Sequence, residues 1–152
     1  QEMNRKGIAF KTFEIDVNWV QPDEAVSKFF SIPQHKEVLC MERLRGLSEG
    51  PIVYFVSYFH PRVGLTGKED FSKPLYKMLE EEYSTVVATS KEEISAKLAD
   101  ENIAGKLKIN AGSPILKRKR YVLEPGGRTV EYNIGYYNAE HFTYLIDIQK
   151  GN

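Results

Sequence analysis

The sequence predicts an α+β fold in which an antiparallel β-sheet carries short helices between pairs of strands. Two apolar segments, 38–45 and 115–123, each end near alternating basic residues and are each followed by a turn that contains glycine. A second strand rich in Tyr and Val follows each turn, as in a β-hairpin. Strands joined largely by hairpins, with helical segments between the pairs, indicate the α+β class.

The first predicted elements are a strand and a helix. Apolar and polar side chains alternate over residues 10–17, as in a half-buried strand. Pro22 begins a short helix whose acidic first turn favours the helix dipole, and the helix ends at Ile32-Pro33. The predicted strand places Phe13, Ile15 and Val17 on one face and Thr12, Glu14 and Asp16 on the other.

The remaining elements follow in order along the chain. The alternation and turn patterns predict a hairpin of 38–45 and 51–59 around the turn 46–50, a loop over 60–67, a helix from Pro74, a helix over 99–107, a hairpin of 115–123 and 129–137 around 124–127, and a last strand over 143–148. Residues 86–96 stay undecided, because the first half favours a strand and Glu92-Glu93 weakens that prediction.

Composition indicates one globular domain in a reducing compartment. The chain has 152 residues, 41% of them hydrophobic, and its 21 basic residues balance 21 acidic ones. A neutral chain of this size builds a core but does not wrap nucleic acid unaided. The single cysteine, Cys40, excludes an internal disulfide. No apolar run approaches the ~20 residues that span a bilayer, so we expect a cytoplasmic protein without membrane partners.

The paired arginines of the first hairpin are the strongest candidates for a binding site. Arg43 and Arg45 are two positions apart and therefore point from one face of a strand. Guanidinium groups grip phosphate or carboxylate through parallel hydrogen bonds. The alternative is a pair of surface arginines in salt bridges with Glu42 or Glu49.

The second hairpin offers a weaker basic cluster and a polar face. The run 117–120 is typical of a sheet edge or a solvated face, which leaves Arg120 as a candidate and makes Arg118 an improbable one. Glu131 shares a strand face with Thr129, Asn133 and Tyr137, whereas Val130, Tyr132, Ile134 and Tyr136 take the other. Tyr76, Tyr137 and Ser57 could equally be half-buried or core side chains without a ligand.

Catalytic and metal-binding motifs are lacking in the sequence. His35, His60 and His141 do not cluster at a metal-ligand spacing. Cys40 has no adjacent histidine, so a buried, inert thiol is expected. The glycines read as turn residues and form no phosphate loop or dinucleotide motif. We therefore predict no catalytic residue, no metal and no cofactor.

The order of several short motifs resembles the UTRA domain, the effector-binding half of HutC-type GntR transcription regulators. The resemblance begins with an R-x-R, turn, P-I, S-Y pattern and extends through most of the chain. The residues that carry it are Met41 to Arg45, Pro51-Ile52, Ser57 to Phe59, Leu75-Tyr76, Leu79, Glu93 to Ala96, Leu107, Pro114 to Leu116, Arg120, Val130-Glu131 and Tyr136-Tyr137.

The resemblance implies a chorismate-lyase-like fold, a small anionic effector and a homodimer. It also implies a winged helix-turn-helix domain that contacts DNA and is absent from this chain. On this interpretation residues 1–9 are a linker remnant and residues 10–150 form the UTRA domain. The function implied is that of the ligand sensor of a bacterial repressor or activator.

The resemblance also assigns roles to individual residues. Arg43 and Arg45 fall on arginines that contact the anionic part of the effector, and Arg120 matches the pattern. Tyr76, Glu131 and Tyr137 fall on pocket positions, with Glu131 accepting hydrogen bonds from hydroxyls or amines. The full set of predicted ligand-binding residues is Arg43, Arg45, Phe55, Ser57, Tyr76, Arg120, Glu131 and Tyr137.

Two positions depart from the pattern of relatives that bind phosphorylated sugars. Phe55 stands where a glutamate often lies, and Pro74 stands where a phosphate-binding serine often lies. These departures make a standard amino-sugar phosphate less suitable. Two alternatives therefore stay open: an enzyme of the chorismate lyase kind, and a dimerisation module whose pocket has collapsed.

Overall fold

The computed structural model describes residues 10–143. These residues form a six-stranded sheet in the order β1-β2-β3-β6-β5-β4, with every neighbouring pair antiparallel. The elements are β1 (Lys11–Val20), α1 (Glu24–Phe30), β2 (Val38–Leu47), β3 (Gly50–Phe59), α2 (Leu75–Tyr83), β4 (Thr89–Leu98), α3 (Glu101–Leu107), β5 (Pro114–Leu123) and β6 (Thr129–Asn138). The predicted α+β class is confirmed.

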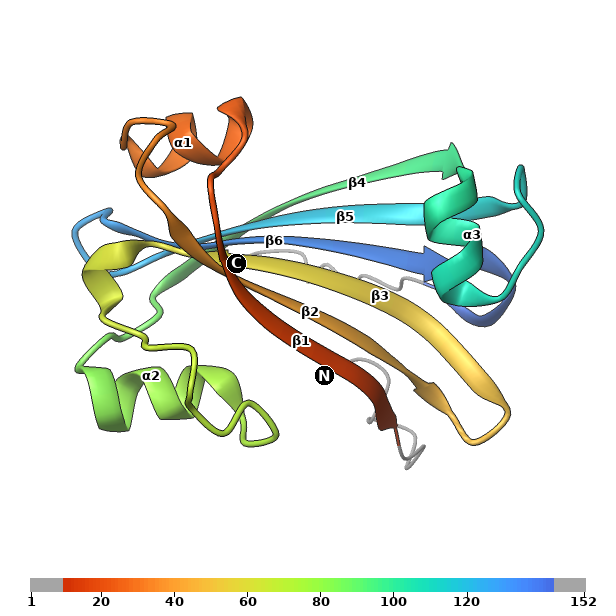
Figure 1. The fold of residues 1–152 in the computed structure, drawn as a ribbon, viewed down its shortest axis with the longest axis horizontal. Helices are drawn as coiled ribbons and strands as arrows, with labels where there is room; N and C mark the ends of the chain where they lie inside the picture. Colours follow the sequence, from red (N-terminus) through yellow and green to blue (C-terminus); the bar gives the residue numbers. More distant parts are fainter. Residues whose placement is uncertain (1–9, 144–152) are drawn as a thin grey trace, which may run out of the picture.

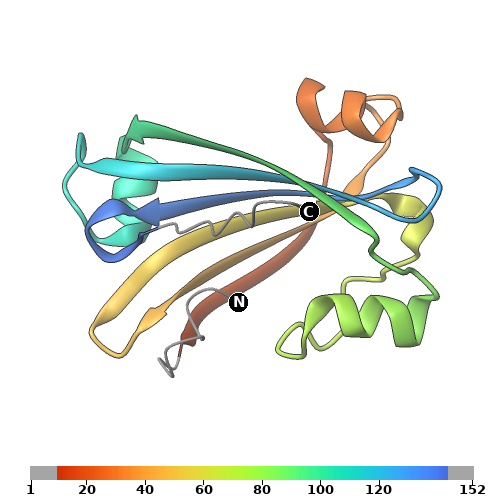
Figure 2. The same ribbon diagram turned by 180° about the vertical axis from the view of Figure 1, so that it is seen from behind.

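The helices cover the two faces of the sheet unequally. On one face, α1 packs Val26 and Phe30 against one end of the strands, and α3 packs Ile103 and Leu107 against the other end. On the opposite face, α2 packs Met78 and Leu79 onto the sheet. Figure 1 shows α1 and α3 at opposite ends of the long strands, and Figure 2 shows the same molecule from behind. Among the described residues, no other helix covers the sheet face on which α2 lies.

Local sequence signals explain where the helices begin and end. The Asp23 and Asp100 side chains accept hydrogen bonds from the first turns of α1 and α3, which satisfies backbone donors that the helix cannot pair. Both helices end at a left-handed residue, Ser31 and Lys108. The predicted end of α1 at Ile32-Pro33 lies just beyond the observed one.

The undecided segment 86–96 is resolved as a strand. β4 spans Thr89–Leu98 and, among residues 10–143, pairs only with β5, at the edge of the sheet. All ten of its residues are exposed, so Glu92 and Glu93 sit where charge is tolerated and discourages pairing with another chain. The same arrangement corrects the interpretation of the run 117–120, because β5 lies inside the sheet between β4 and β6.

Two β-bulges overturn predictions that rested on strict alternation. The β1–β2 register shifts between Thr12 and Glu14, so Thr12 and Ile15 both line the same cavity, although alternation put them on opposite faces. The β5–β6 register skips Val130, which joins the core cluster beside α2. In each case the extra residue of the bulge reverses which face the following side chains take.

Other predicted boundaries need small corrections or cannot be compared. The first hairpin turn is shorter than 46–50, because the β2–β3 ladder continues to Leu47 and Gly50. The loop 60–67 contains a 3₁₀ turn over Pro61–Val63. All but the first residue of the predicted strand 143–148 lies outside the described residues. Within residues 10–143, no helix has the length and apolar character needed to cross a bilayer.

Candidate functional site

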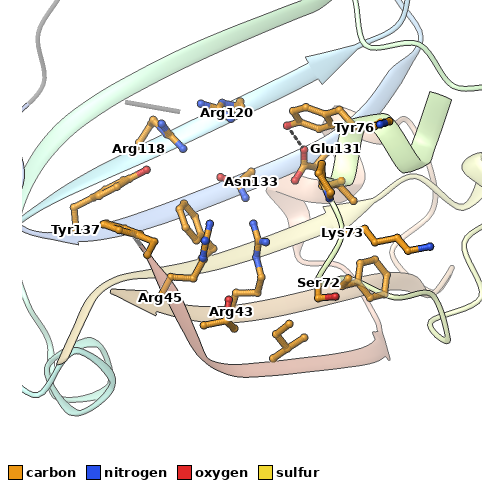
Figure 3. A pocket seen from close by; sticks show the side chains of 18 residues that line it. Arg43, Arg45, Ser72, Lys73, Tyr76, Arg118, Arg120, Glu131, Asn133 and Tyr137 are labelled. Carbon is orange, nitrogen blue, oxygen red and sulfur yellow. Dashed lines mark hydrogen bonds between the residues drawn. The ribbon is translucent and has the colours of Figure 1, made fainter. Parts of the chain in front are cut away.

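A cavity of about 450 Å³ lies between the sheet face on which α2 packs and the segment that leads into α2. Figure 3 shows side chains from the strands of the sheet and from α2 facing this space. The sheet contributes Arg43, Arg45, Phe55, Arg118, Arg120, Glu131, Asn133 and Tyr137, and the segment 71–77 closes one side. The cavity is open, which argues against the collapsed-pocket alternative.

The hollow follows from the size of the side chains on the two central strands. Ser57 on β3 and Asn133 and Gly135 on β6 are small and lie next to one another in the register. The strands that flank this pair, β2 and β5, carry arginines on the same face: Arg43 lies opposite Phe55, and Arg118 and Arg120 lie opposite Gly135 and Asn133. Short side chains in the middle and long ones at the sides make a concave floor with basic walls.

The cavity wall is strongly basic. Its lining includes six basic side chains and one acidic side chain, Glu131, among the residues that the structure describes. The basic residues are Arg43, Arg45, Lys73, Lys77, Arg118 and Arg120. A concave surface lined by one sign of charge concentrates small ions of the opposite sign.

The arginines of β2, Arg43 and Arg45, differ from those of β5 in their acidic partners. No carboxylate of the described residues forms a salt bridge with either of them, and the Nε atom of each is buried without a hydrogen-bond partner. Burial and the neighbouring charge of Arg45 lower the pKa of Arg43, and the Glu131 carboxylate offsets only part of this effect. The Arg43 guanidinium lies 5.6 Å from the centre of the Phe55 ring, so the aromatic ring supports the charge without neutralising it.

Arg118 and Arg120 on β5 share an acidic partner. The Glu92 carboxylate on β4 lies 2.7 Å from Arg120 Nη2 and 3.8 Å from Arg118 Nη1. Burial lowers the pKa of Arg120, but Tyr76 and Glu92 outweigh it and raise the pKa. Arg118 is 5% exposed and lies 5.3 Å from the Tyr137 ring centre. The site thus includes Arg118, which the sequence had made an improbable candidate.

Polar side chains of β6 and α2 complete the far end of the cavity. The Tyr76 hydroxyl donates a 2.6 Å hydrogen bond to Glu131, whose side chain is fully buried. Burial and the Glu131 carboxylate raise the pKa of Tyr76, so its hydroxyl keeps its proton. Asn133 donates through Nδ2 to the Ser57 hydroxyl at 2.5 Å. These contacts fix the carboxylate and the amide in the floor.

Aromatic rings form the remaining wall. Phe55 and Tyr137 meet edge to face, with centroids 5.9 Å apart. Both rings pass over Gly135, where an added Cβ would lie 2.9 Å from a Tyr137 carbon and 3.2 Å from a Phe55 carbon. The absence of a side chain at Gly135 therefore lets the two rings enclose that side of the cavity.

The structure brings together all of the predicted site residues except Ser57. Arg43, Arg45, Phe55, Tyr76, Arg120, Glu131 and Tyr137 line the cavity, whereas Ser57 lies beneath it as the partner of Asn133. Sequence reasoning did not assign a role to Asn133, Ser72 or Lys73. Asn133 could have been predicted as a site residue, because it shares a strand face with Glu131 and Tyr137. Ser72 and Lys73 could not, because they precede a helix whose position on the sheet the sequence does not specify. The role of the predicted residues in binding a ligand stays a prediction.

Comparison with known proteins defines the class. The UTRA domain family matches residues 5–143, and the chain belongs to this family. A curated relative, the HTH-type transcriptional regulator Rv0792c of Mycobacterium tuberculosis, is 26% identical over 120 residues, which are 75% of this chain and 44% of the relative. The chain thus spans less than half of that relative's length.

Solved structures agree with this assignment. A GntR-family transcriptional regulator from Enterococcus faecalis V583 is 26% identical, with a TM-score of 0.79 over 92% of this chain and 100% of that one. PhnF from Mycobacterium smegmatis has the same fold, with a TM-score of 0.85 at 15% identity over 97% of this chain and 66% of that one. The chain is a UTRA effector-binding domain of the GntR-family regulators, which confirms the expectation of a binding domain over an enzyme.

Proposed function

We propose that the cavity binds a small anionic metabolite and that this chain is the sensor domain of a transcription regulator. The observation that carries the proposal is the pair Arg43 and Arg45, which line the cavity and form no salt bridge with a carboxylate among residues 10–143. Buried charge is costly unless it is paired. A phosphate, phosphonate or carboxylate group of the effector supplies the missing negative charge through bidentate hydrogen bonds.

Binding to purified protein tests the anion site. Thermal shift and calorimetry against inorganic phosphate, sugar phosphates, phosphonates and dicarboxylates are expected to find at least one class that stabilises the domain. Arg43→Gln and Arg45→Gln are expected to weaken that ligand by about 10- to 100-fold, because each removes charged hydrogen bonds worth ~1.5–3 kcal/mol.

A matched control separates local binding from overall charge. Lys119 lies between Arg118 and Arg120 on β5 and points to the other face of the sheet. Lys119→Gln removes one positive charge outside the cavity and is expected to leave the affinity within two-fold of the wild type. An affinity that falls equally in Arg43→Gln and Lys119→Gln contradicts the proposed site.

The link to DNA is part of the proposal. The similarity to longer HTH-type regulators supports a winged helix-turn-helix domain joined to this one in a cytoplasmic homodimer. The effector then changes DNA affinity by binding two conformations of the dimer unequally. Light scattering of the domain tests the dimer, and DNA binding of the longer protein with and without the effector tests the coupling. A monomer at all concentrations contradicts the dimeric sensor.

A further inference from the structure

Glu92 on β4 forms an ion pair with an arginine of the cavity, although Glu92 does not line the cavity itself. Arg120 is among the lining residues and lies opposite Glu92 in the β4–β5 register. The Oε2 atom of Glu92 accepts a hydrogen bond from Arg120 Nε at 2.8 Å and lies 2.7 Å from Nη2. The carboxylate therefore neutralises, from the edge of the sheet, a guanidinium group that forms part of the cavity wall.

The contact with Arg120 uses only part of the Glu92 carboxylate. Oε2 makes both short contacts to Arg120 and also the longer one, 3.8 Å, to Arg118. An arginine binds a carboxylate or phosphate most strongly when two of its nitrogens meet two oxygens in parallel. A ligand group that offers two oxygens to Arg120 can therefore replace this pairing with a stronger one.

The position of Glu92 at the edge of the sheet allows its carboxylate to be displaced. Among residues 10–143, β4 has one neighbouring strand, β5, and β4 is exposed along its whole length. The side chains of Glu92 and Arg120 are 22% and 19% exposed. Water can solvate the carboxylate once it leaves the arginine, so its exchange for another anion does not strand a buried charge.

We propose that Arg120 is a second anion-binding position of the cavity and that Glu92 occupies this position as an internal competitor. Arg120 lies on β5, whereas Arg43 and Arg45 lie on β2, with β3 and β6 between them. Figure 3 shows the arginines of the two walls on either side of Asn133. A phosphate, phosphonate or carboxylate group that reaches Arg120 displaces Glu92. Glu92 thereby lowers the affinity of this wall for anions.

Titration with inorganic phosphate, followed by the chemical shifts of the domain in NMR spectra, measures the competition, because this method detects weak as well as tight binding. Glu92→Gln removes the competing charge and is expected to tighten phosphate binding by about three- to ten-fold. Glu93→Gln is the matched control. It removes the same charge from the next residue of β4, which lies on the opposite face and contacts Tyr121. Its affinity is expected to stay within two-fold of the wild type, because solvent and salt screen that charge.

Double variants show whether the gain in affinity arises at Arg120. In the Arg120→Gln background, Glu92→Gln is expected to change the affinity by less than two-fold, because the carboxylate acts through that arginine. In the Arg43→Gln background the three- to ten-fold gain is expected to persist, because Arg43 belongs to the opposite wall. Such a cycle isolates the coupling between two residues. Glu92→Ala takes the place of Glu92→Gln if thermal unfolding shows that the glutamine variant does not fold.

The outcomes separate this inference from the proposed function. An equal gain in Glu92→Gln and Glu93→Gln, or a gain that persists without Arg120, indicates general charge repulsion and overturns the competition. Phosphate binding that depends on Arg43 but is unchanged or weaker in Glu92→Gln also overturns it, and leaves the proposed anion site standing.

The reverse result is equally informative. A gain that requires Arg120, in a domain whose phosphate affinity does not depend on Arg43, supports the inference and contradicts the proposed role of Arg43. If phosphate binds neither the wild type nor Glu92→Gln, Glu92 excludes no anion and the inference fails. The wider panel of phosphonates, sugar phosphates and dicarboxylates still tests the site at Arg43 and Arg45 in that case.

Discussion

Tyr76 on α2 donates a 2.6 Å hydrogen bond to the buried Glu131 carboxylate on β6, 55 positions away in the sequence. This contact ties the helix to the buried carboxylate in the cavity floor. We expect Tyr76→Phe to lower the free energy of unfolding by about 1–3 kcal/mol, because it leaves a buried acceptor without its donor. Urea denaturation measures the change.

A second tyrosine offers a control for this effect. The Tyr121 hydroxyl donates to Glu93 at 2.7 Å, but this contact is exposed. Tyr121→Phe is expected to cost less than about 1 kcal/mol, since water replaces the lost partner. Equal losses in the two variants would mean that the buried position of Glu131 does not determine the cost.

The Cys40 thiol is expected to be unreactive in the folded protein. Burial, and next the Glu42 carboxylate, raise its pKa to about 12. The thiolate is the reactive species, so at pH 8 almost none is present. Titration with a thiol-specific disulfide reagent is expected to show no fast phase in buffer and one equivalent in urea. A fast reaction in buffer contradicts the buried, protonated state.

Glu69 anchors the loop that precedes the cavity segment 71–77. Burial raises the pKa of Glu69, but hydrogen bonds from the Thr66 backbone and the Tyr83 hydroxyl outweigh it and lower the pKa to about 2. Because the folded pKa lies below the ordinary value of 4.5, this stabilisation is present above about pH 4.5. It is lost as the pH falls toward 2.

A pH series of melting temperatures checks this behaviour. Glu69→Gln is expected to melt below the wild type at pH 7, and the gap is expected to narrow as the pH falls from about 4.5. Glu80→Gln, on the exposed side of α2, serves as the control and is expected to show no such gap. A gap that is constant with pH would indicate that ionised Glu69 does not hold the loop.

Local patterns in the sequence predicted most of this fold. The two hairpins and the three helices appear near their expected positions because alternation, capping residues and turn glycines act over a few neighbouring residues. The bulges at β1 and at Val130 escaped prediction, because a strand pattern does not reveal one extra residue that its partner strand must accommodate.

Less of the site could be predicted, because the site depends on strand pairings between segments that are distant in the sequence. Arg43 and Arg45 were found from their spacing on one strand. Arg118 was missed because a run of four charges suggests an edge, and only the pairing of β4 with β5 removes β5 from that edge. Asn133 was placed on the correct face, but its contact with Ser57 depends on the β3–β6 register, which joins residues 76 positions apart.

Gly135 is expected to control the shape of the aromatic wall. An alanine Cβ there would lie 2.9 Å from Tyr137 and 3.2 Å from Phe55, so the rings must move into the cavity or away from each other. Gly135→Ala is expected to destabilise the domain by about 1–3 kcal/mol through overpacking and to alter anion affinity.

Gly105→Ala is the matched control, because Gly105 lies in α3 with open space around its Cβ position. That change is expected to stabilise the domain by about 0.5–1 kcal/mol, since alanine favours helix. Opposite shifts in melting temperature for the two variants would confirm that the packing of the Phe55 and Tyr137 rings requires a glycine at position 135. If both substitutions raise the melting temperature, the Phe55 and Tyr137 rings move aside without destabilising the domain, and the prediction is wrong.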